Sequence, residues 1–358
     1  MSLNLGSAYL LNQPQHRATF AGLIYVASFD SAFSRHPCGR GFTYRTPTGR
    51  TLKCARTRHR IESLVIPPAW QQVRIHPEPK AHLQVIGTDA AGRQQSIYHP
   101  IWSEISNLAK FARLAEFGAV LPKIRRRIQR DLRNSQDRQS RILAAIVRLL
   151  DRGHLRIGNR RYTQTNGSRG AVTLLNRHVE IEGEEIQLHF PGKSGQQRNV
   201  DLRDKRLAKL LRRCLQTEGS HLFQCPDERG NYRPVRSRQV ADYLLEISND
   251  IASPKDFRTW WASAEACSLL GELDFELPDS KLKREVNRAV KAVAAGLGNT
   301  PAVCRASYIH PGLLRLATER KLSELIARSP VLQPRLMTLA EATLLATLPK
   351  LPLPALLS

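Results

Sequence analysis

A lysine that could take part in phosphate chemistry stands in the segment 190-FPGKSG-195. Gly-Lys-Ser is the end of the nucleotide-binding phosphate loop G-x-x-x-x-G-K-[ST], whose first glycine would stand five residues before the second. That position is Gln187, and the preceding 179-VEIEGEEIQLHF-190 alternates apolar and polar residues around a central glycine, as a half-buried β-hairpin does. The pattern therefore argues against an ATPase and predicts that Lys193 lies just after a strand, on an exposed glycine-rich turn.

Phosphate chemistry without a metal needs three kinds of group, and the chain holds candidates for each. An arginine fork binds two phosphate oxygens and keeps its charge. A lysine can donate a proton to the leaving oxygen, because its pKa falls beside other cations. A tyrosine can form a covalent intermediate. None of these is diagnostic alone among 55 Lys and Arg residues, so composition and spacing by themselves indicate only a basic nucleic-acid-binding protein.

The charge balance points to a polyanionic partner. The 55 Lys and Arg residues against 31 Asp and Glu residues give a net charge of +24 and a pI near 10.5. Between Lys123 and Arg161 there are thirteen basic residues and three acidic ones. A solvated basic helix face would have the same composition, but together with the net charge the cluster favours contact with the backbone of a nucleic-acid duplex.

The cysteines and the hydropathy favour a soluble protein of a reducing, intracellular compartment. Six cysteines are scattered without a C-x-x-C pair, so neither a zinc site nor a disulfide framework is indicated. The apolar run 20-FAGLIYVASF-29 is too short to span a membrane, and no clear basic region precedes it as in a signal peptide.

Two domains are expected, the first rich in strands. Residues 1–38 show little helical periodicity and are interpreted as a variable, partly ordered extension. Residues 39–105 are predicted to form a small β-rich domain, since 41-GFTYRTPTGR-50 and 82-HLQVIGTDAAGR-93 are each typical of a strand that runs into a turn.

The second domain, residues 106–330, is predicted to be mainly helical, with the hairpin of residues 179–190 inside it. In 138-RQSRILAAIVRLLDRG-153 apolar residues recur at helical spacing, and Gly153 is placed to end the helix. The proline-broken segment 331–358 is expected to be a loose tail. The fold class is therefore α+β.

The amino-acid sequences of several segments resemble those of one known family. These segments are 64-LVIPPAWQQVRIHPEPKAHLQVIGTDAAGR-93, 154-HLRIGNRRYTQTNGSRGAVTLLNRHVEI-181, 190-FPGKSG-195, 255-KDFRTW-260 and 298-GNTPAVCRASYIHP-311. Together they resemble the type IB DNA topoisomerases of the short bacterial and poxvirus branch, in the right order from Gly39 to Leu325. The resemblance implies a catalytic domain of the tyrosine recombinase/topoisomerase IB type and a C-shaped clamp that closes around duplex DNA.

The resemblance also implies roles for five residues. Tyr308 stands at the position of the nucleophile and Lys193 at that of the general acid, which protonates the 5′ oxygen. Arg156 and Arg258 match the two arginines that hold the phosphate. Asn299 matches a position that is histidine in many relatives and asparagine in much of the bacterial branch, and its amide could donate to a non-bridging oxygen.

Taken singly, each of these residues has an ordinary explanation. Arg156 could be a helix-end arginine, Lys193 an exposed turn lysine, and Tyr308 a packing residue with a hydrated hydroxyl. Asn299 or Thr300, followed by a proline, is typical of a helix N-cap, and the start of a helix also favours a phosphate. The agreement of several motifs favours the catalytic interpretation.

Further DNA contacts are expected around this set. Lys255 falls where the family often places another basic residue near the scissile phosphate. The remaining residues predicted to contact DNA are Arg93, Tyr98, Arg125, Arg126, Arg127 and Arg160.

The implied reaction is transesterification. Tyr308 attacks a phosphodiester to give a 3′-phosphotyrosyl link and a free 5′-hydroxyl, and after rotation of the broken strand the hydroxyl attacks back. Neither ATP nor a metal or other cofactor is required. A monomer that acts on double-stranded DNA at the cytoplasmic nucleoid is expected.

Two rival functions remain open at this point. A tyrosine recombinase or integrase shares the catalytic logic, but recombinases usually carry His-x-x-Arg where this chain has Lys255-Asp256-Phe257-Arg258, and they lack the segment 64-LVIPPAW-70. An inactive DNA-binding clamp is the other, and the five filled catalytic positions argue against it.

Overall fold

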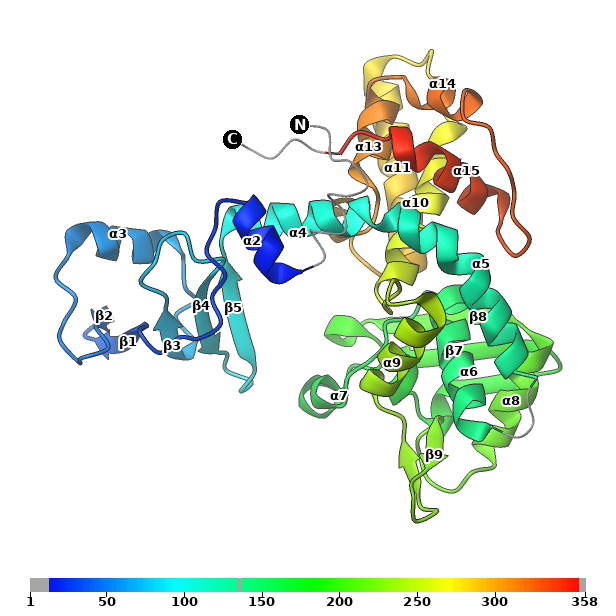
Figure 1. Ribbon diagram of the computed structural model, residues 1–358, viewed down its shortest axis with the longest axis horizontal. Helices are drawn as coiled ribbons and strands as arrows, with labels where there is room; N and C mark the ends of the chain where they lie inside the picture. The colour runs from blue at the N-terminus through cyan, green and yellow to red at the C-terminus, as the bar shows by residue number, and fades with distance from the viewer. Residues whose placement is uncertain (1–12, 134–136, 354–358) are drawn as a thin grey trace. The chain divides into compact units, whose positions relative to one another are not determined.

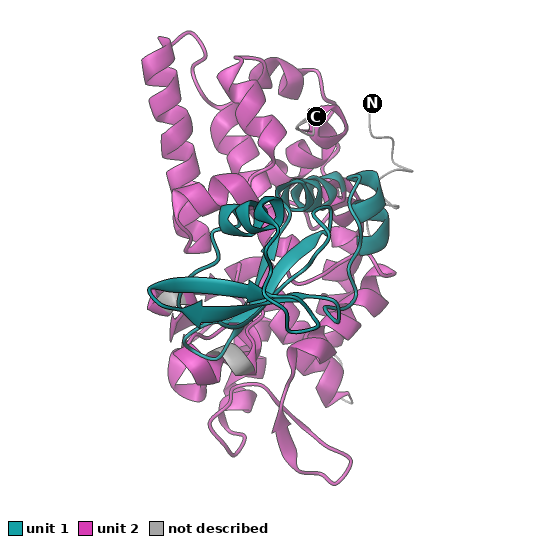
Figure 2. Ribbon diagram, turned by 90° about the vertical axis from the view of Figure 1, so that its left-hand side faces the viewer, with its two compact units in different colours: residues 1–112, 354–358 teal, residues 113–353 magenta. Residues whose placement is uncertain are grey.

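The computed structural model describes residues 13–133 and 137–353, apart from the side chains of residues 161, 162 and 194. The start of the expected extension and the end of the expected tail lie outside these ranges. The chain divides into two compact units between Ala112 and Arg113, coloured separately in Figure 2. The predicted boundary near residue 105 lies too early in the chain, because the whole of α4 (Pro100–Ala112) belongs to unit 1. Trp102 of α4 packs edge-on against His82 of this unit, with ring centroids 4.5 Å apart.

Unit 1 is built on an antiparallel five-stranded sheet with the strand order β2-β1-β3-β4-β5 (Figure 1). Its strands are β1 (Phe33–Cys38), β2 (Gly41–Arg45), β3 (Gln71–Ile75), β4 (Leu83–Thr88) and β5 (Gln94–Tyr98). The other helices of the unit are α2 (Pro14–Phe20) and α3 (Ala55–Ser63). Ile61 of α3 packs on Val73, Ile75 and Val85 of the sheet, so the predicted β-rich character is confirmed.

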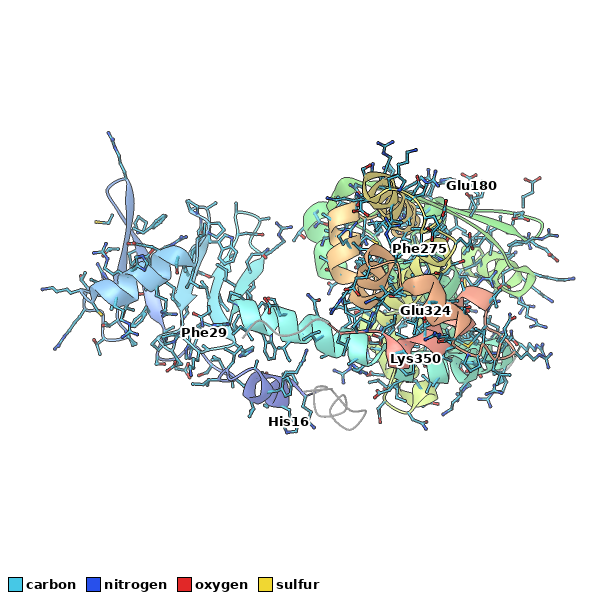
Figure 3. The ribbon with its side chains drawn as sticks, turned by 90° about the horizontal axis from the view of Figure 1, so that it is seen from above. His16, Phe29, Glu180, Phe275, Glu324 and Lys350 are labelled. Atoms are coloured by element: carbon cyan, nitrogen blue, oxygen red, sulfur yellow. The ribbon has the colours of Figure 1, made fainter. Side chains whose placement is uncertain are left out.

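The residues expected to form an N-terminal extension are in part integral to this unit. Strand β1 lies between β2 and β3, so the sheet begins before residue 39. Phe29, labelled in Figure 3, is buried and meets the ring of His76 edge-on at 5.6 Å. The alternation that marks a strand is interrupted in 33-FSRHPC-38 by polar residues and a proline, which hides β1 from periodicity.

Unit 2 is mainly helical, as predicted. Its α-helices are α5 (Leu114–Asp131), α6 (Arg138–Gly153), α7 (Arg160–Asn166), α8 (Lys205–Leu215), α9 (Ser237–Ser248), α10 (Asp256–Gly271), α11 (Asp279–Leu297), α12 (Pro301–Ser307), α13 (Pro311–Thr318), α14 (Leu322–Ala327) and α15 (Leu339–Thr347). Its 3₁₀ turns are η1 (Ala171–Thr173), η2 (Asn176–His178), η3 (Lys193–Gly195) and η4 (Leu348–Lys350). Its strands are β6 (Val179–Glu182), β7 (Glu185–Pro191), β8 (Gln197–Arg203), β9 (Gln224–Pro226) and β10 (Tyr232–Pro234).

The predicted hairpin of residues 179–190 is confirmed as β6 and β7, and a third strand extends it. Strand β8 pairs antiparallel with β7 along its whole length, so η3 with Lys193 is the turn between them. Ile186, Leu188 and Phe190 alternate inward from β7. The segment 197-QRNVDLR-203 is mostly polar, which explains why its periodicity did not indicate a strand.

Helix α6 ends at Gly153, as predicted, but the glycine is not its left-handed cap. Gly153 is the last helical residue, and His154 takes the left-handed conformation with φ 53°. Gly153 serves close packing instead, because a Cβ atom there would lie 2.5 Å from Leu155 Cδ1 and 3.3 Å from Val200 Cγ1.

Helix α10 contacts α5, α6, α11, α13, α14 and α15, and Figure 1 shows it among them. Because α15 packs on α10, residues 331–353 are not the loose tail that was expected. Thr338 and Glu341 form a capping box at the start of α15. Lys350, labelled in Figure 3, donates to the Arg328 carbonyl at 3.0 Å and to Ser329 Oγ at 3.2 Å.

None of the helices in the described ranges is long and apolar enough to cross a lipid bilayer.

Candidate active site

The site forms around the C-terminal end of helix α11. After Leu297 the chain turns through Gly298, whose φ of 57° is left-handed, and passes directly into Asn299. Two arginines bond the last carbonyls of the helix. Arg258 Nη2 donates to the Leu297 carbonyl at 3.0 Å, and Arg198 Nη2 to the Gly296 carbonyl at 3.0 Å. Cations are favoured there because the helix end carries partial negative charge.

Arg258 is buried in the first turn of α10, with 3% of its surface exposed. Its Nη1 donates to the His154 carbonyl, and its Nε has no hydrogen-bond partner in the structure. Its Cζ atom lies 5.2 Å from the ring centroid of Tyr308. No carboxylate of the described residues forms an ion pair with it, so its positive charge is not neutralised.

His154 supports Arg258 without adding charge. Its ring stacks on Trp261 of α10 with centroids 4.1 Å apart. Burial, together with the charges of Arg258 and Arg198, lowers the pKa of His154 to about 3, so the imidazole is neutral at neutral pH. The left-handed backbone of His154 turns its carbonyl toward Arg258.

Arg156 and Asn299 are paired. Arg156 Nη2 donates to Asn299 Oδ1, while Asn299 Nδ2 is buried without a hydrogen-bond partner in the structure. Of the two possible caps of α12, Thr300 takes the role, since its Oγ1 accepts from the Val303 N–H at 3.3 Å. The Asn299 side chain is therefore left for the site.

Tyr308 follows the last residue of α12, and its backbone is fixed to α10. Ser263 Oγ donates to the Tyr308 carbonyl at 3.1 Å and accepts from the His310 N–H at 3.0 Å. Burial raises the pKa of the phenol, but the charges of Arg258 and Arg156 and the Asn299 amide outweigh it, and the net pKa is lowered. The environment thus makes the Tyr308 phenol more acidic than that of a free tyrosine.

Lys193 is exposed on the turn η3, as predicted, and its side chain makes no hydrogen bond or ion pair with the described residues. The turn is held by the Gly192 N–H, which donates to the Gln196 carbonyl at 2.7 Å. Lys255 is also exposed and precedes α10, where its carbonyl accepts from the Arg258 N–H at 3.2 Å. The structure thus gathers Arg156, Arg258, Asn299 and Tyr308. No hydrogen bond joins Lys193 to these four among the described residues, but its turn adjoins Arg198, which bonds the end of α11.

Sequence reasoning missed Arg198, Ser263 and His154. Arg198 and Ser263 gave no signal, because each acts on backbone groups that lie far along the chain. His154 was inside a quoted motif, but its left-handed conformation could not be anticipated there.

The basic residues predicted to contact DNA from α5 have different surroundings. Arg125 is buried between Asp151 and Glu341, with an Nη2 contact of 2.7 Å to each carboxylate, so it has no donor left for a phosphate. Arg127 forms an ion pair with Asp131 at 2.7 Å, so part of its guanidinium is already occupied by a carboxylate. Arg126 is exposed, and no ion pair to it is found among the described residues.

The other predicted DNA contacts are at the surface. Arg160 is exposed at the start of α7. Tyr98 on β5 is 44% exposed. Arg93 pairs with Asp89 at 2.7 Å across the β4–β5 turn, and this bond, with the Arg93 backbone N–H, holds the pKa of that carboxyl well below its usual range.

Comparison with known proteins identifies the family of the chain. Residues 101–324, more than half of the chain, match the family described as eukaryotic DNA topoisomerase I, catalytic core. Residues 41–89 match the bacterial DNA topoisomerase IB N-terminal domain.

Individual relatives give the same result. The chain is 32% identical to DNA topoisomerase 1B of Acanthamoeba polyphaga mimivirus over 257 residues, which cover 70% of this chain and 76% of the relative. It is 21% identical to DNA topoisomerase 1B of Vaccinia virus (strain Copenhagen) over 282 residues, covering 76% and 82%. The chain belongs to the type IB DNA topoisomerases.

Proposed function

We propose that the protein relaxes supercoiled duplex DNA by transesterification, with Tyr308 as the nucleophile. Its phenol first loses its proton to solvent, and the phenolate oxygen attacks a backbone phosphorus. The bond to the 5′ oxygen breaks as Lys193 gives that oxygen a proton. The products are a 3′-phosphotyrosyl link and a 5′-hydroxyl. The broken strand rotates, the hydroxyl returns its proton to Lys193 as it attacks the phosphorus, and Tyr308 leaves as the phenolate. The phosphodiester is thus restored without an external energy source.

One observation carries this proposal. Arg258 Nε and Asn299 Nδ2 are buried donors without partners, and both residues lie beside Tyr308. Buried polar groups are rarely left unsatisfied, and such donors next to a nucleophile are suited to the non-bridging oxygens of a phosphate. The absence of a paired carboxylate on Arg258 leaves net positive charge for the pentacoordinate transition state.

The same features give the nucleophile its reactivity. Arg258 and Arg156 lower the pKa of Tyr308 and so raise the fraction of phenolate at neutral pH. Arg156 would release Asn299 when a phosphate oxygen takes the place of Asn299 Oδ1.

DNA contact would come from both units. We assign Tyr98 in unit 1, and Arg126, Arg160 and Lys255 in unit 2, to the duplex, since all four are exposed. Arg93 would hold the β4–β5 turn in shape through its ion pair with Asp89, next to the proposed DNA contact of Tyr98. The proposal includes a C-shaped clamp formed by the two units around DNA and a monomer that acts in the cytoplasm.

Relaxation of supercoiled plasmid without ATP and in EDTA tests the proposal. The wild type should relax the plasmid, and Tyr308→Phe should not relax it while it binds DNA with nearly wild-type affinity, because only the nucleophilic oxygen is removed. A covalent adduct on nicked duplex, trapped by denaturation, should form with the wild type alone. Relaxation or an adduct by Tyr308→Phe would contradict the role of Tyr308.

A further inference from the structure

We infer that Arg198 is a positioning residue that ties the turn of Lys193 to the end of helix α11 and so places the general acid at the scissile phosphate. The inference rests on the proposed function and adds to it a residue that does not itself touch the substrate. It assigns a role to a third guanidinium of the site, partly buried, that the reaction described above does not use.

The stem of Arg198 lies against the turn of Lys193. Arg198 is on β8, opposite the end of β7, where Phe190 is its partner in register. A Cβ atom at Gly192 would lie 2.8 Å from Arg198 Cγ, so only glycine lets the stem pass over the residue before Lys193. Any movement of the turn is therefore coupled to the path of this side chain.

The guanidinium of Arg198 reaches the opposite wall of the site. Its Nη2 donates to the Gly296 carbonyl at 3.0 Å, and its Nη1 makes a longer contact of 3.4 Å to the Ala295 carbonyl. A Cβ atom at Gly298 would lie 2.8 Å from Arg198 Cζ, so the turn into Asn299 is closed over the guanidinium. One side chain thus spans from Lys193's turn to the residue before Asn299.

Helix α11 is the common reference for the site. Its last carbonyl, that of Leu297, accepts from Arg258, and the carbonyl just before it accepts from Arg198. Asn299, which follows, accepts from Arg156. Through these bonds the nucleophile's cationic neighbours and the turn of the general acid are set against one backbone segment, which is how a rigid element fixes a catalytic geometry.

An arginine suits this place in spite of its cationic neighbours. Burial, with the charge of Arg156, lowers the pKa of Arg198, so the position is electrostatically unfavourable for a cation. The negative end of α11 offsets part of this cost, and a rigid planar fork reaches two successive carbonyls with two separate nitrogens. No ion pair with a carboxylate was found for Arg198 in the described part of the chain.

The test uses a leaving group that needs no proton. In a duplex whose scissile 5′ oxygen is replaced by sulfur, the P–S bond breaks to give a thiolate. A thiolate leaves without a general acid because the pKa of a thiol, about 8.5 for cysteine, lies far below that of an alcohol. Defects of the general acid should disappear on this substrate, whereas defects of phosphate binding or of the nucleophile should persist. The cleavage site is first mapped with the wild type, and single-turnover cleavage is then measured on the oxygen and sulfur duplexes.

Arg198→Met keeps an aliphatic stem over Gly192 and removes the bonds to α11. We expect it to cleave the oxygen duplex about 10²-fold more slowly than the wild type, a typical size for impaired general acid catalysis, and the sulfur duplex within a few-fold of the wild type. Lys193→Ala should show the same pattern with a larger loss. Arg203→Met, on the same strand but exposed and paired with Glu184 and Glu185, should match the wild type on both duplexes.

The outcomes separate the possible roles. If Arg198→Met is equally slow on both duplexes while Lys193→Ala is rescued by sulfur, Arg198 acts on the phosphate or the fold, and the inference is overturned. Unchanged cleavage of the oxygen duplex by a folded Arg198→Met protein would also overturn it. A wild type that leaves both duplexes uncut would contradict the proposed function itself and this role with it.

Discussion

Two arginine clusters of unit 2, both largely shielded from solvent, differ in what satisfies their guanidinium groups. Arg125 is held by the carboxylates of Asp151 and Glu341, and Glu341 in turn accepts from Trp260 Nε1 at 3.0 Å. Arg258 and Arg198 are held by backbone carbonyls, and no carboxylate of the described residues pairs with either. The first cluster is compensated in charge, and the second keeps the positive charge that a phosphate needs.

The comparison shows why buried arginines of one chain take different roles. A guanidinium between two carboxylates is a structural cross-link, because removing it leaves uncompensated charges in the interior. A guanidinium bonded to neutral carbonyl oxygens is fixed in position, but its positive charge still acts on its surroundings. Such an uncompensated group is costly to bury, which is seen in the lowered pKa of Arg258, caused by burial and by Arg156. An anionic ligand would relieve this cost.

The largest effect is expected where the uncompensated cluster is broken. Arg258→Ala should slow single-turnover DNA cleavage by about 10³-fold, since it removes a preorganised donor and charge at the phosphorus. DNA affinity should change only a few-fold, because phosphate contacts elsewhere dominate binding. A cleavage rate near that of the wild type would show that the buried charge of Arg258 does not act on the reaction.

The compensated cluster should respond in the opposite way. Arg125→Ala leaves Asp151 and Glu341 facing each other, with side-chain exposures of 3% and 8%, and should lower the free energy of unfolding by about 3–5 kcal/mol. Cleavage by the folded fraction at low temperature should stay near the wild-type rate. Denaturant unfolding of Arg125→Ala and Arg258→Ala side by side checks this, and a greater loss of stability in Arg258→Ala would break the comparison.

Much of the site was predictable because its motifs are local. Arg156, Lys193, Arg258, Asn299 and Tyr308 were found from short segments, and the structure brings four of them together. A short sequence motif contains the residues that contact the substrate. The β-rich and the helical parts were also predictable, because the apolar residues of their strands and helices recur with clear periods.

The roles of the other arginines depend on partners distant in sequence. Arg125 is one of three consecutive arginines, and its partner Glu341 lies 216 residues away. Arg198 bonds a helix end 98 residues away. Only the tertiary contacts distinguish Arg125 and Arg198 from Arg126, since all three have the same side chain. Helix α15 did carry a local signal, since 338-TLAE-341 has the form of a capping box before an apolar run.

The pH dependence of cleavage sharpens the electrostatic side of the comparison. The phenolate is the attacking form of Tyr308, so the rate should rise with pH through the pKa of this group. Because Arg258 and Arg156 lower that pKa, the rise should lie below the pH at which free tyrosine ionises. Arg156→Gln should move it to higher pH, while Arg125→Gln should not, as its charge is compensated. Single-turnover rates from pH 5 to 10 test this, and equal profiles would argue against activation by the arginines.

The smallest effect concerns the surface of α5, where Arg126 and Arg127 are neighbours with different partners. Arg126 is exposed, and if it contacts a phosphate, Arg126→Ala should weaken DNA binding by roughly tenfold or less. The slope of log affinity against log salt should become shallower by about 0.9, the value for one lost phosphate contact.

Arg127→Ala is the matched control for this prediction. Arg127 already pairs with Asp131, whose carboxylate also accepts from the Tyr243 hydroxyl at 2.9 Å. Its loss should leave the salt slope close to that of the wild type and lower stability instead, because Asp131 is largely buried. If both variants changed the slope equally, pairing with a carboxylate would not decide whether an arginine of this chain is free to bind DNA. The distinction between compensated and uncompensated arginines would then apply to the buried clusters alone.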